Sequence, residues 1–448
     1  MNQNKKSIFV TSDGKNLAFT FILVSSLFLL WGFCNGMIDV MDKHFQEELH
    51  LTMAQSANVQ WAHYLGYFLM ALPAGWLATK LGYKGGIITG LLMVAVGGLW
   101  FIPATHIAQF WAFLIGVCFI AAGLTFLETI ANPYTTVLGP TQFAATRINL
   151  AQSCNGIGWI FGPIAGSMFF YGKDSAGHST GATTLWIPYA GVAVVVIILA
   201  VIFYFANVPD IKTEDDYHLD DAATGVSHSI WKHPHFVMAV VAQFFYVAAQ
   251  SGIFAFFINY MTSQTPGIPD SWNSFMRPSW LEKGADGTVH LTNAFASILA
   301  SGGFVFFLVG RFTGAALLKK FSAHKMLGTY ALLNVVACLL IFAKLGWVSV
   351  VCVFLSYFFM SIMFPTIFAL GIFGLGARAK KASSFIVMAI MGGALLPKLM
   401  GSIADKYDVS RGFIVPAACF AIVALYGFNW SKFSRAESLN GTKITTGH

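Results

Sequence analysis

Charged residues are scarce in this chain of 448 residues: Asp, Glu, Lys and Arg make up only 10% of it, whereas 56% is hydrophobic. Soluble domains carry roughly 25% charged residues, so a water-soluble fold of this length would lack the polar surface that it needs. The composition therefore predicts an integral membrane protein. The formal net charge of +7 is modest, and its basic residues lie in loops and tails, which disfavours nucleic acid as a partner.

Motifs for metals, disulfides and nucleotides are also missing. None of the six cysteines lies in a CxxC pair, and the twelve histidines show no metal-ligand spacing. No Walker A, GxSxG or dinucleotide-binding glycine pattern is present. The sequence thus predicts no metal, no cofactor and no enzymatic activity.

Long apolar runs are what the chain has in abundance. A helix needs about 20 apolar residues to cross the hydrocarbon, and this length predicts twelve spans. The first is predicted to be a retained helix and not a signal peptide, because no small-residue cleavage site follows it. The predicted centres are Leu29, Leu65, Val94, Phe119, Ile157, Val195, Phe245, Gly303, Asn334, Tyr357, Met388 and Phe420.

A polar, acidic stretch, "NVPDIKTEDDYHLDDAATGVSHSIWKHPH", divides these spans into two sets of six. It predicts a first half over 1–206, a linker over 207–234, a second half over 235–434 and a tail over 435–448. The two halves resemble each other in sequence. Both "AGWLATKLGYKGG" and "GRFTGAALLKKFSAHK" place small residues before basic residues, and both "ANPY" and "MFPT" contain a proline. The predicted fold is all-α, with twelve transmembrane helices in two pseudo-symmetric halves, which is the repeat plan of major facilitator transporters.

Basic residues mark alternate loops and fix the predicted orientation. By the positive-inside rule these loops, and with them both termini, face the cytoplasm. The residues are Lys80, Lys84, Arg147, Lys319, Lys320, Lys325, Arg378, Lys380 and Lys381.

Two acids interrupt the apolar runs. Glu128 lies in "FLETIANPY", and Asp39 lies in the first span within "WGFCNGMIDVMDKHF". A charged side chain at membrane depth costs about 2.5–3.5 kcal/mol on insertion scales, so such acids usually carry protons, bind substrate or pair. Two alternatives stay open: Glu128 as a permanently neutral packing acid, and Asp39 as an interfacial acid at a helix end.

Polar amides cluster in the same half as these acids, and a further pair lies in the second half. Gln152 and Asn155 are three residues apart in "NLAQSCNGIG" and share a helix face, as do Gln243 and Gln250, seven apart. Amides, carboxylates and aromatic faces together bind sugars, although each single amide also serves as an interhelical hydrogen bond. The predicted substrate site comprises Glu128, Gln152, Asn155, Asn35, Gln60, Gln250 and Tyr246.

Two basic residues lie close to helix ends. Arg311, in "VGRFTG", is predicted either to gate the cytoplasmic side or to extend its charge to the interface. Lys398, in "GALLPKLMGSIAD", is predicted to extend outward or to pair with Asp405.

Six segments together resemble the L-fucose:proton symporter group of the major facilitator superfamily, which also contains glucose/galactose transporters. They are "LWGFCNGMID", "QWAHYLGYFLMALPAGWLATKLGYKGGIITG", "AAGLTFLETIANPYTTVLGP", "RINLAQSCNGIG", "GRFTGAALLKKF" and "SIMFPTIFALGIFGLG". The resemblance implies that Asp39 is the proton-coupling acid and that Glu128 couples protonation to sugar binding. It also places Gln152 and Asn155 at the sugar site.

The sequence departs from the group at two points. Thr79-Lys80 stands where the superfamily usually has an Asp-Arg pair, and Met363-Phe364 stands where fucose transporters carry Gln-Tyr. The second departure bears on the identity of the sugar: proton-coupled import of L-fucose is the favoured prediction. The alternative is a glucose or galactose symporter of the same group, coupled to protons or to sodium. The resemblance implies a monomer in a bacterial inner membrane that imports a monosaccharide with protons; a sugar sensor without transport is the distant alternative.

Overall fold

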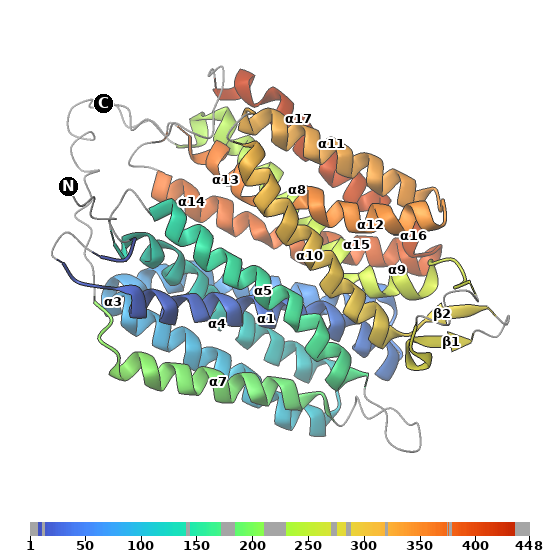
Figure 1. Ribbon diagram of the computed structural model, residues 1–448, viewed down its shortest axis with the longest axis horizontal. Helices are drawn as coiled ribbons and strands as arrows, with labels where there is room; N and C mark the ends of the chain where they lie inside the picture. Colours follow the sequence, from blue (N-terminus) through green and yellow to red (C-terminus); the bar gives the residue numbers. More distant parts are fainter. Residues whose placement is uncertain are drawn as a thin grey trace, which may run out of the picture. The chain divides into compact units, whose positions relative to one another are not determined.

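The structure is a computed structural model that describes residues 8–10, 14–139, 144–171, 184–209, 230–269, 276–283, 288–318, 321–373, 375 and 379–434. These residues form α-helices, short 3-10 turns and one two-stranded antiparallel sheet (Figure 1). The helices are α1 (Ala18–Glu48), α2 (Met53–Ser56), α3 (Asn58–Ile107), α4 (Phe110–Val137), α5 (Ala144–Phe170), α7 (Trp186–Phe205), α8 (Pro234–Ala255), α9 (Phe257–Ser263), α10 (Asn293–Leu317), α11 (Ala323–Phe342), α12 (Trp347–Met360), α13 (Met363–Ile372), α14 (Ala379–Met388), α15 (Gly392–Lys406), α16 (Val409–Gly412) and α17 (Ile414–Ser434). The strands β1 (Leu281–Lys283) and β2 (Val289–Leu291) pair with Leu281 opposite Leu291.

Ten stretches of helix in the described residues are long and apolar enough to cross a membrane. The two other predicted spans correspond to the first part of α3 and to α5. Within α3, Gly82 has a φ of 68°, so two spans that form one continuous element are separated by a non-helical residue. Glycine suits this position because it has no Cβ to clash in the left-handed region.

Contacts divide the chain into two compact units. The first comprises residues 1–38 and 65–214, and the second comprises 39–64 and 215–448. Residues 39–64, here called the 39–64 segment, contain the end of α1, all of α2 and the start of α3. The predicted boundaries of the two halves stay a prediction; residues 210–229 of the predicted linker and the 435–448 tail lie outside the described residues.

Glycines let α1 and α5 approach closely in the first unit. A Cβ added at Gly32 would overlap the carbonyl oxygen of Asn155, and one at Gly158 would overlap that of Leu29. Small residues at such contacts allow backbones to meet, which is a common way for membrane helices to associate. This contact holds the amide-bearing face of α5 against α1.

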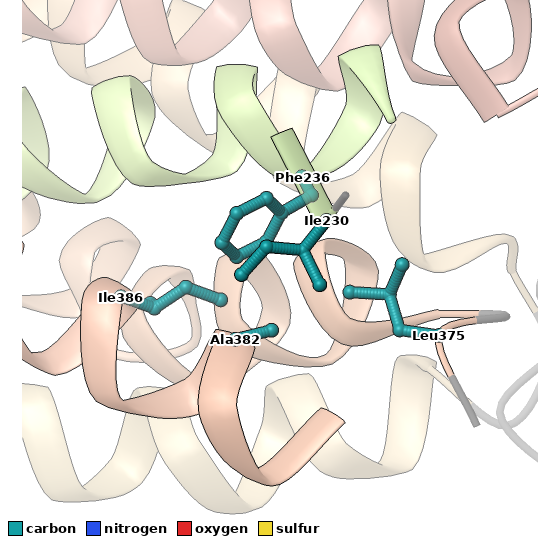
Figure 2. Close-up of a cluster of buried hydrophobic side chains, with 5 residues drawn as sticks. All are labelled: Ile230, Phe236, Leu375, Ala382 and Ile386. Carbon is teal, nitrogen blue, oxygen red and sulfur yellow. The ribbon is translucent and has the colours of Figure 1, made fainter. Parts of the chain in front are cut away.

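Helix α8 is the centre of the second unit, where it packs against α13, α15 and α17. At its start, Phe236 lies in a buried cluster with Ile230, Leu375, Ala382 and Ile386 (Figure 2). Pro234 occupies the first turn of α8, where its missing N–H has no helical partner to lose. The cluster therefore fixes where α8 begins, against α14.

The 39–64 segment is held on the second unit by polar contacts. Asp405 on α15 accepts hydrogen bonds from the backbone N–H groups of Met53 (2.7 Å) and Ala54 (2.8 Å). Lys398 extends to Asn58 at 3.4 Å. The carboxylate of Asp405 thus serves the first turn of α2, and the hydrogen-bond partner of Lys398 is Asn58, not Asp405.

Replacing Gly32 with alanine is expected to destabilise the protein, because the added Cβ meets backbone that cannot move aside as a side chain could. Overpacking of this kind costs about 1–3 kcal/mol. The measurement is the free energy of unfolding in mild detergent. The matched control is Gly191→Ala on α7, where a Cβ would have nothing within 4 Å. Equal stability of the two variants would contradict the close α1–α5 contact.

Candidate functional site

Glu128 borders a small hollow in the first unit. The hollow is a shallow, open depression between α1 and α4; its lining residues are Leu27, Phe28, Trp31, Leu127, Glu128 and Ala131. Glu128 is only partly buried, whereas Leu127 beside it is 1% exposed. A carboxylate next to an indole ring at the edge of a hollow is a typical arrangement for binding a small polar molecule with an apolar face.

A chain of hydrogen bonds supports Glu128. The Trp31 indole Nε1–H donates to the Tyr67 hydroxyl at 2.7 Å, and Tyr67 is in turn hydrogen-bonded to Glu128. An indole N–H can only donate, so the Tyr67 oxygen accepts and its proton is available for the Glu128 carboxylate. Three helices, α1, α3 and α4, thereby fix the position of one acid.

The predicted amides of the first unit lie on α1 and α5. Asn155 is 3% exposed, and its Nδ2 donates to the carbonyl oxygen of Phe28 at 3.3 Å. Asn35 is buried, and its Oδ1 has no hydrogen-bond partner among the described residues. Gln152 is partly buried, one turn before Asn155. The Asn155 contact reaches the same turn of α1 that lines the hollow beside Glu128.

Asp39 and Gln60 lie in the second unit and contact each other directly. The Gln60 Nε2 donates to the Asp39 Oδ1 at 2.7 Å, and the two side chains are 8% and 2% exposed. The other carboxylate oxygen, Oδ2, is buried without a partner in the described part of the chain. An acid with one satisfied and one open oxygen can take up a proton without losing its existing hydrogen bond.

The remaining predicted residues surround the middle of α8 and the end of α10. The Tyr246 hydroxyl donates to the Met360 carbonyl at 3.0 Å, just before the break between α12 and α13. Arg311 lies over the Phe307 ring at 4.8 Å, with its Nε unpaired among the described residues. Gln250 is partly buried.

Three features of the site were not in the predicted residue set. Tyr67 connects Trp31 to Glu128, but a tyrosine in an apolar helix has no spacing that signals this role. Gln243 has no exposed surface, and neither of its amide atoms has a partner in the described residues. Its position seven residues before Gln250 is the signal that could have added it. Asp42 lies one helical turn after Asp39 and has no exposed surface; as an acid in the same apolar run, it carries the same signal as Asp39.

Membrane-spanning helices that place acids, amides and aromatic rings in their interior define a class of proteins that carry polar solutes across a bilayer. Residues 17–277 match the Major Facilitator Superfamily, and the chain belongs to this family. It is 35% identical to the L-fucose-proton symporter of Escherichia coli (strain K12) over 91% of this chain and 92% of that protein. It is 31% identical to a glucose/galactose transporter of Brucella abortus, over 94% of this chain and 96% of the relative.

A solved structure agrees with these relatives. The crystal structure of the E. coli fucose:proton symporter matches with a TM-score of 0.64 at 34% identity, covering 92% of this chain and 98% of that one. The predicted all-α membrane fold and the predicted family are therefore confirmed.

The Trp31–Tyr67 pair is expected to act as one unit in a double-mutant cycle. Tyr67→Phe removes the acceptor of the indole N–H and a hydrogen bond to Glu128, and an unsatisfied buried polar group costs about 1–3 kcal/mol. Trp31→Phe in the Tyr67→Phe background should then cost less than it does alone, by about 1 kcal/mol. Thermal unfolding of the four proteins measures this coupling, and additive losses would show that the hydrogen bond contributes nothing.

Proposed function

We propose that the protein is a proton-coupled secondary transporter that imports a monosaccharide, with L-fucose as the preferred substrate, by alternating access. The single observation that carries this proposal is Glu128 at the edge of the hollow beside Trp31, fixed through Tyr67. It joins an acid that can bind a proton to the face of an aromatic ring, and sugars are recognised by such combinations. The fucose:proton symporter relative supports the choice of sugar and ion.

In this proposal Asp39 and Glu128 bind the coupling proton. Glu128, Gln152, Asn155, Asn35, Gln60, Gln250 and Tyr246 bind the sugar, and Arg311 acts in gating. The protein works as a monomer in a bacterial inner membrane with both termini in the cytoplasm, and the basic loops support this orientation. It is not an enzyme and needs no cofactor.

A second candidate is a glucose or galactose transporter of the same group. The Brucella relative, at 31% identity, carries that name, and Phe364 packs against Tyr246 with ring centroids 6.4 Å apart. Fucose transporters carry a tyrosine at the position of Phe364. A phenylalanine supplies an apolar ring but no hydroxyl, which supports a sugar other than L-fucose.

Sugar uptake into proteoliposomes tests the substrate and the ion together. A proton gradient totalling about 150 mV supplies roughly 3.5 kcal/mol, because each 100 mV is worth about 2.3 kcal/mol per charge. At about 1.4 kcal/mol per decade, this sustains on the order of a 300-fold sugar gradient. In a panel of L-fucose, glucose and galactose we expect L-fucose to accumulate and a protonophore to abolish its accumulation.

Two outcomes would contradict this. Accumulation that follows sodium and ignores the pH gradient would assign a sodium-coupled transporter. Binding without counterflow of any of the three sugars would assign a sensor, since only a transporter exchanges sugar between the inside and the outside.

Substitutions at the two acids are expected to separate their roles. Asp39→Asn keeps the shape of the protonated acid but cannot titrate, so proton-driven accumulation should be lost while sugar binding and some counterflow remain. Glu128→Gln should also lose active uptake and, because it lies at the hollow, should change the affinity for sugar or its pH dependence. Binding and counterflow assays on both variants decide this. Wild-type accumulation by Asp39→Asn would make Asp39 an interfacial acid only.

A further inference from the structure

A second buried acid, Asp42, lies one helical turn after Asp39 in the 39–64 segment and is not part of the proposed site. Its side chain has no exposed surface. Its Oδ1 accepts from the Gln46 Nε2 at a long 3.4 Å, and its Oδ2 has no partner among the described residues. Such a carboxylate is poorly satisfied for a charged group in the interior of a protein.

Gln46 connects this acid to the rest of the second unit. Its Nε2 also donates to the Ser56 hydroxyl at 2.8 Å, and its Oε1 accepts from the Asn259 Nδ2 on α9 at 2.6 Å. Gln46 and Asn259 are 8% and 1% exposed. The amide that contacts Asp42 is therefore the one that fastens the 39–64 segment to α9.

The surroundings of Asp42 balance a negative charge only in part: besides Gln46, the Ser56 side chain is a hydrogen-bond partner, and Lys43 supplies a positive charge. On α1, Asp39 lies one turn away, where a second negative charge would be repelled. Lys43 follows Asp42 directly, and its ammonium group is 3.4 Å from Glu47. Glu47 in turn accepts from Asn293 on α10.

The elements packed against the segment add either neutral groups or charged groups that already have other hydrogen-bond partners. Ser56 and Gln60 are neutral, and the adjoining turn of α3 carries His63, which is 5% exposed. Asn259 on α9 is neutral as well. On α15, Asp405 is engaged by two backbone N–H groups and Lys398 by Asn58. The protonated, neutral form of Asp42 therefore suits this buried environment. The charged form needs hydration, and the docked segment excludes water.

We propose that Asp42 is a proton-binding carboxylate whose protonation holds the 39–64 segment on α9 and α15 and whose deprotonation releases it. The docked segment is stable at low pH and is released as the pH rises, because only the charged form gains from hydration. This deepens the proposed symport and rests on it: a proton from the more acidic side would favour docking of the segment before transfer inward.

Distance measurements between two spin labels test the proposal. The labels are placed at His50→Cys and Lys406→Cys, which are both exposed, in the full chain in lipid nanodiscs without sugar. Cys118 and Cys154 are replaced by alanine, since the other four cysteines are buried. We expect the ratio of docked to released populations to fall as the pH rises from 5.5 to 8.5, by up to ~10-fold per pH unit, the limit for one proton.

Three variants give the controls. Asp42→Asn should keep the docked population high and nearly independent of pH, and Asp42→Glu should restore the pH dependence. Asp405→Ala, which removes the acceptor for Met53 and Ala54, should lower the docked population at every pH and leave its pH dependence intact.

The proposal is overturned if the docked population of Asp42→Asn changes with pH as it does in the labelled protein with Asp42 intact. It is also overturned if only Asp39→Asn abolishes the pH dependence, or if sodium replaces protons in docking the segment. Since no sugar or gradient is present, these outcomes are independent of the uptake assays. A parent without pH dependence would refute the role of Asp42 and leave symport standing or falling on sugar uptake alone.

Discussion

The bilayer offers no water to a buried polar group, and the arrangement of this protein follows from that constraint. Each acid in an apolar helix must find donors within the protein, take up a proton or lie beside a hollow. Glu128 has Tyr67 and the hollow; Asp39 has Gln60 and one open oxygen. These arrangements differ: Glu128 lies beside an open depression, whereas Asp39 is buried with one oxygen that has no partner among the described residues.

Close packing of backbones supports this chemistry. Gly32 and Gly158 bring α1 and α5 together so that Asn155 can reach the carbonyl of Phe28. Bulkier residues would separate the helices and with them the amide and the hollow. The contact between α1 and α5 is thus made by backbone and small residues, whereas the buried Arg147 elsewhere in the first unit donates to the carbonyl oxygens of Thr135, Ile8 and Gly139.

Much of the fold could be predicted from the sequence because the length of an apolar run is set by the membrane. Glu128 and Asp39 stood out for the same reason, since any acid in such a run is exceptional. Tyr67 could not be found this way, because its role depends on the approach of Trp31, 36 residues away. Lys398 was predicted to extend outward or to pair with Asp405, but Asp405 instead accepts from the backbone N–H groups of Met53 and Ala54 at the start of α2. Contacts between distant segments are set by packing, which no local pattern encodes.

The partnership between Asp405 and α2 also has a consequence for biosynthesis. Met53 and Asp405 are 352 residues apart, so the start of α2 leaves the ribosome long before its acceptor exists. At about 5–20 residues per second, this delay amounts to roughly 20–70 s. During that time the two backbone N–H groups must be served by water or by the insertion machinery. The four-residue α2 is thus made early in synthesis, but it gains its final hydrogen bonds only after Asp405 has been made.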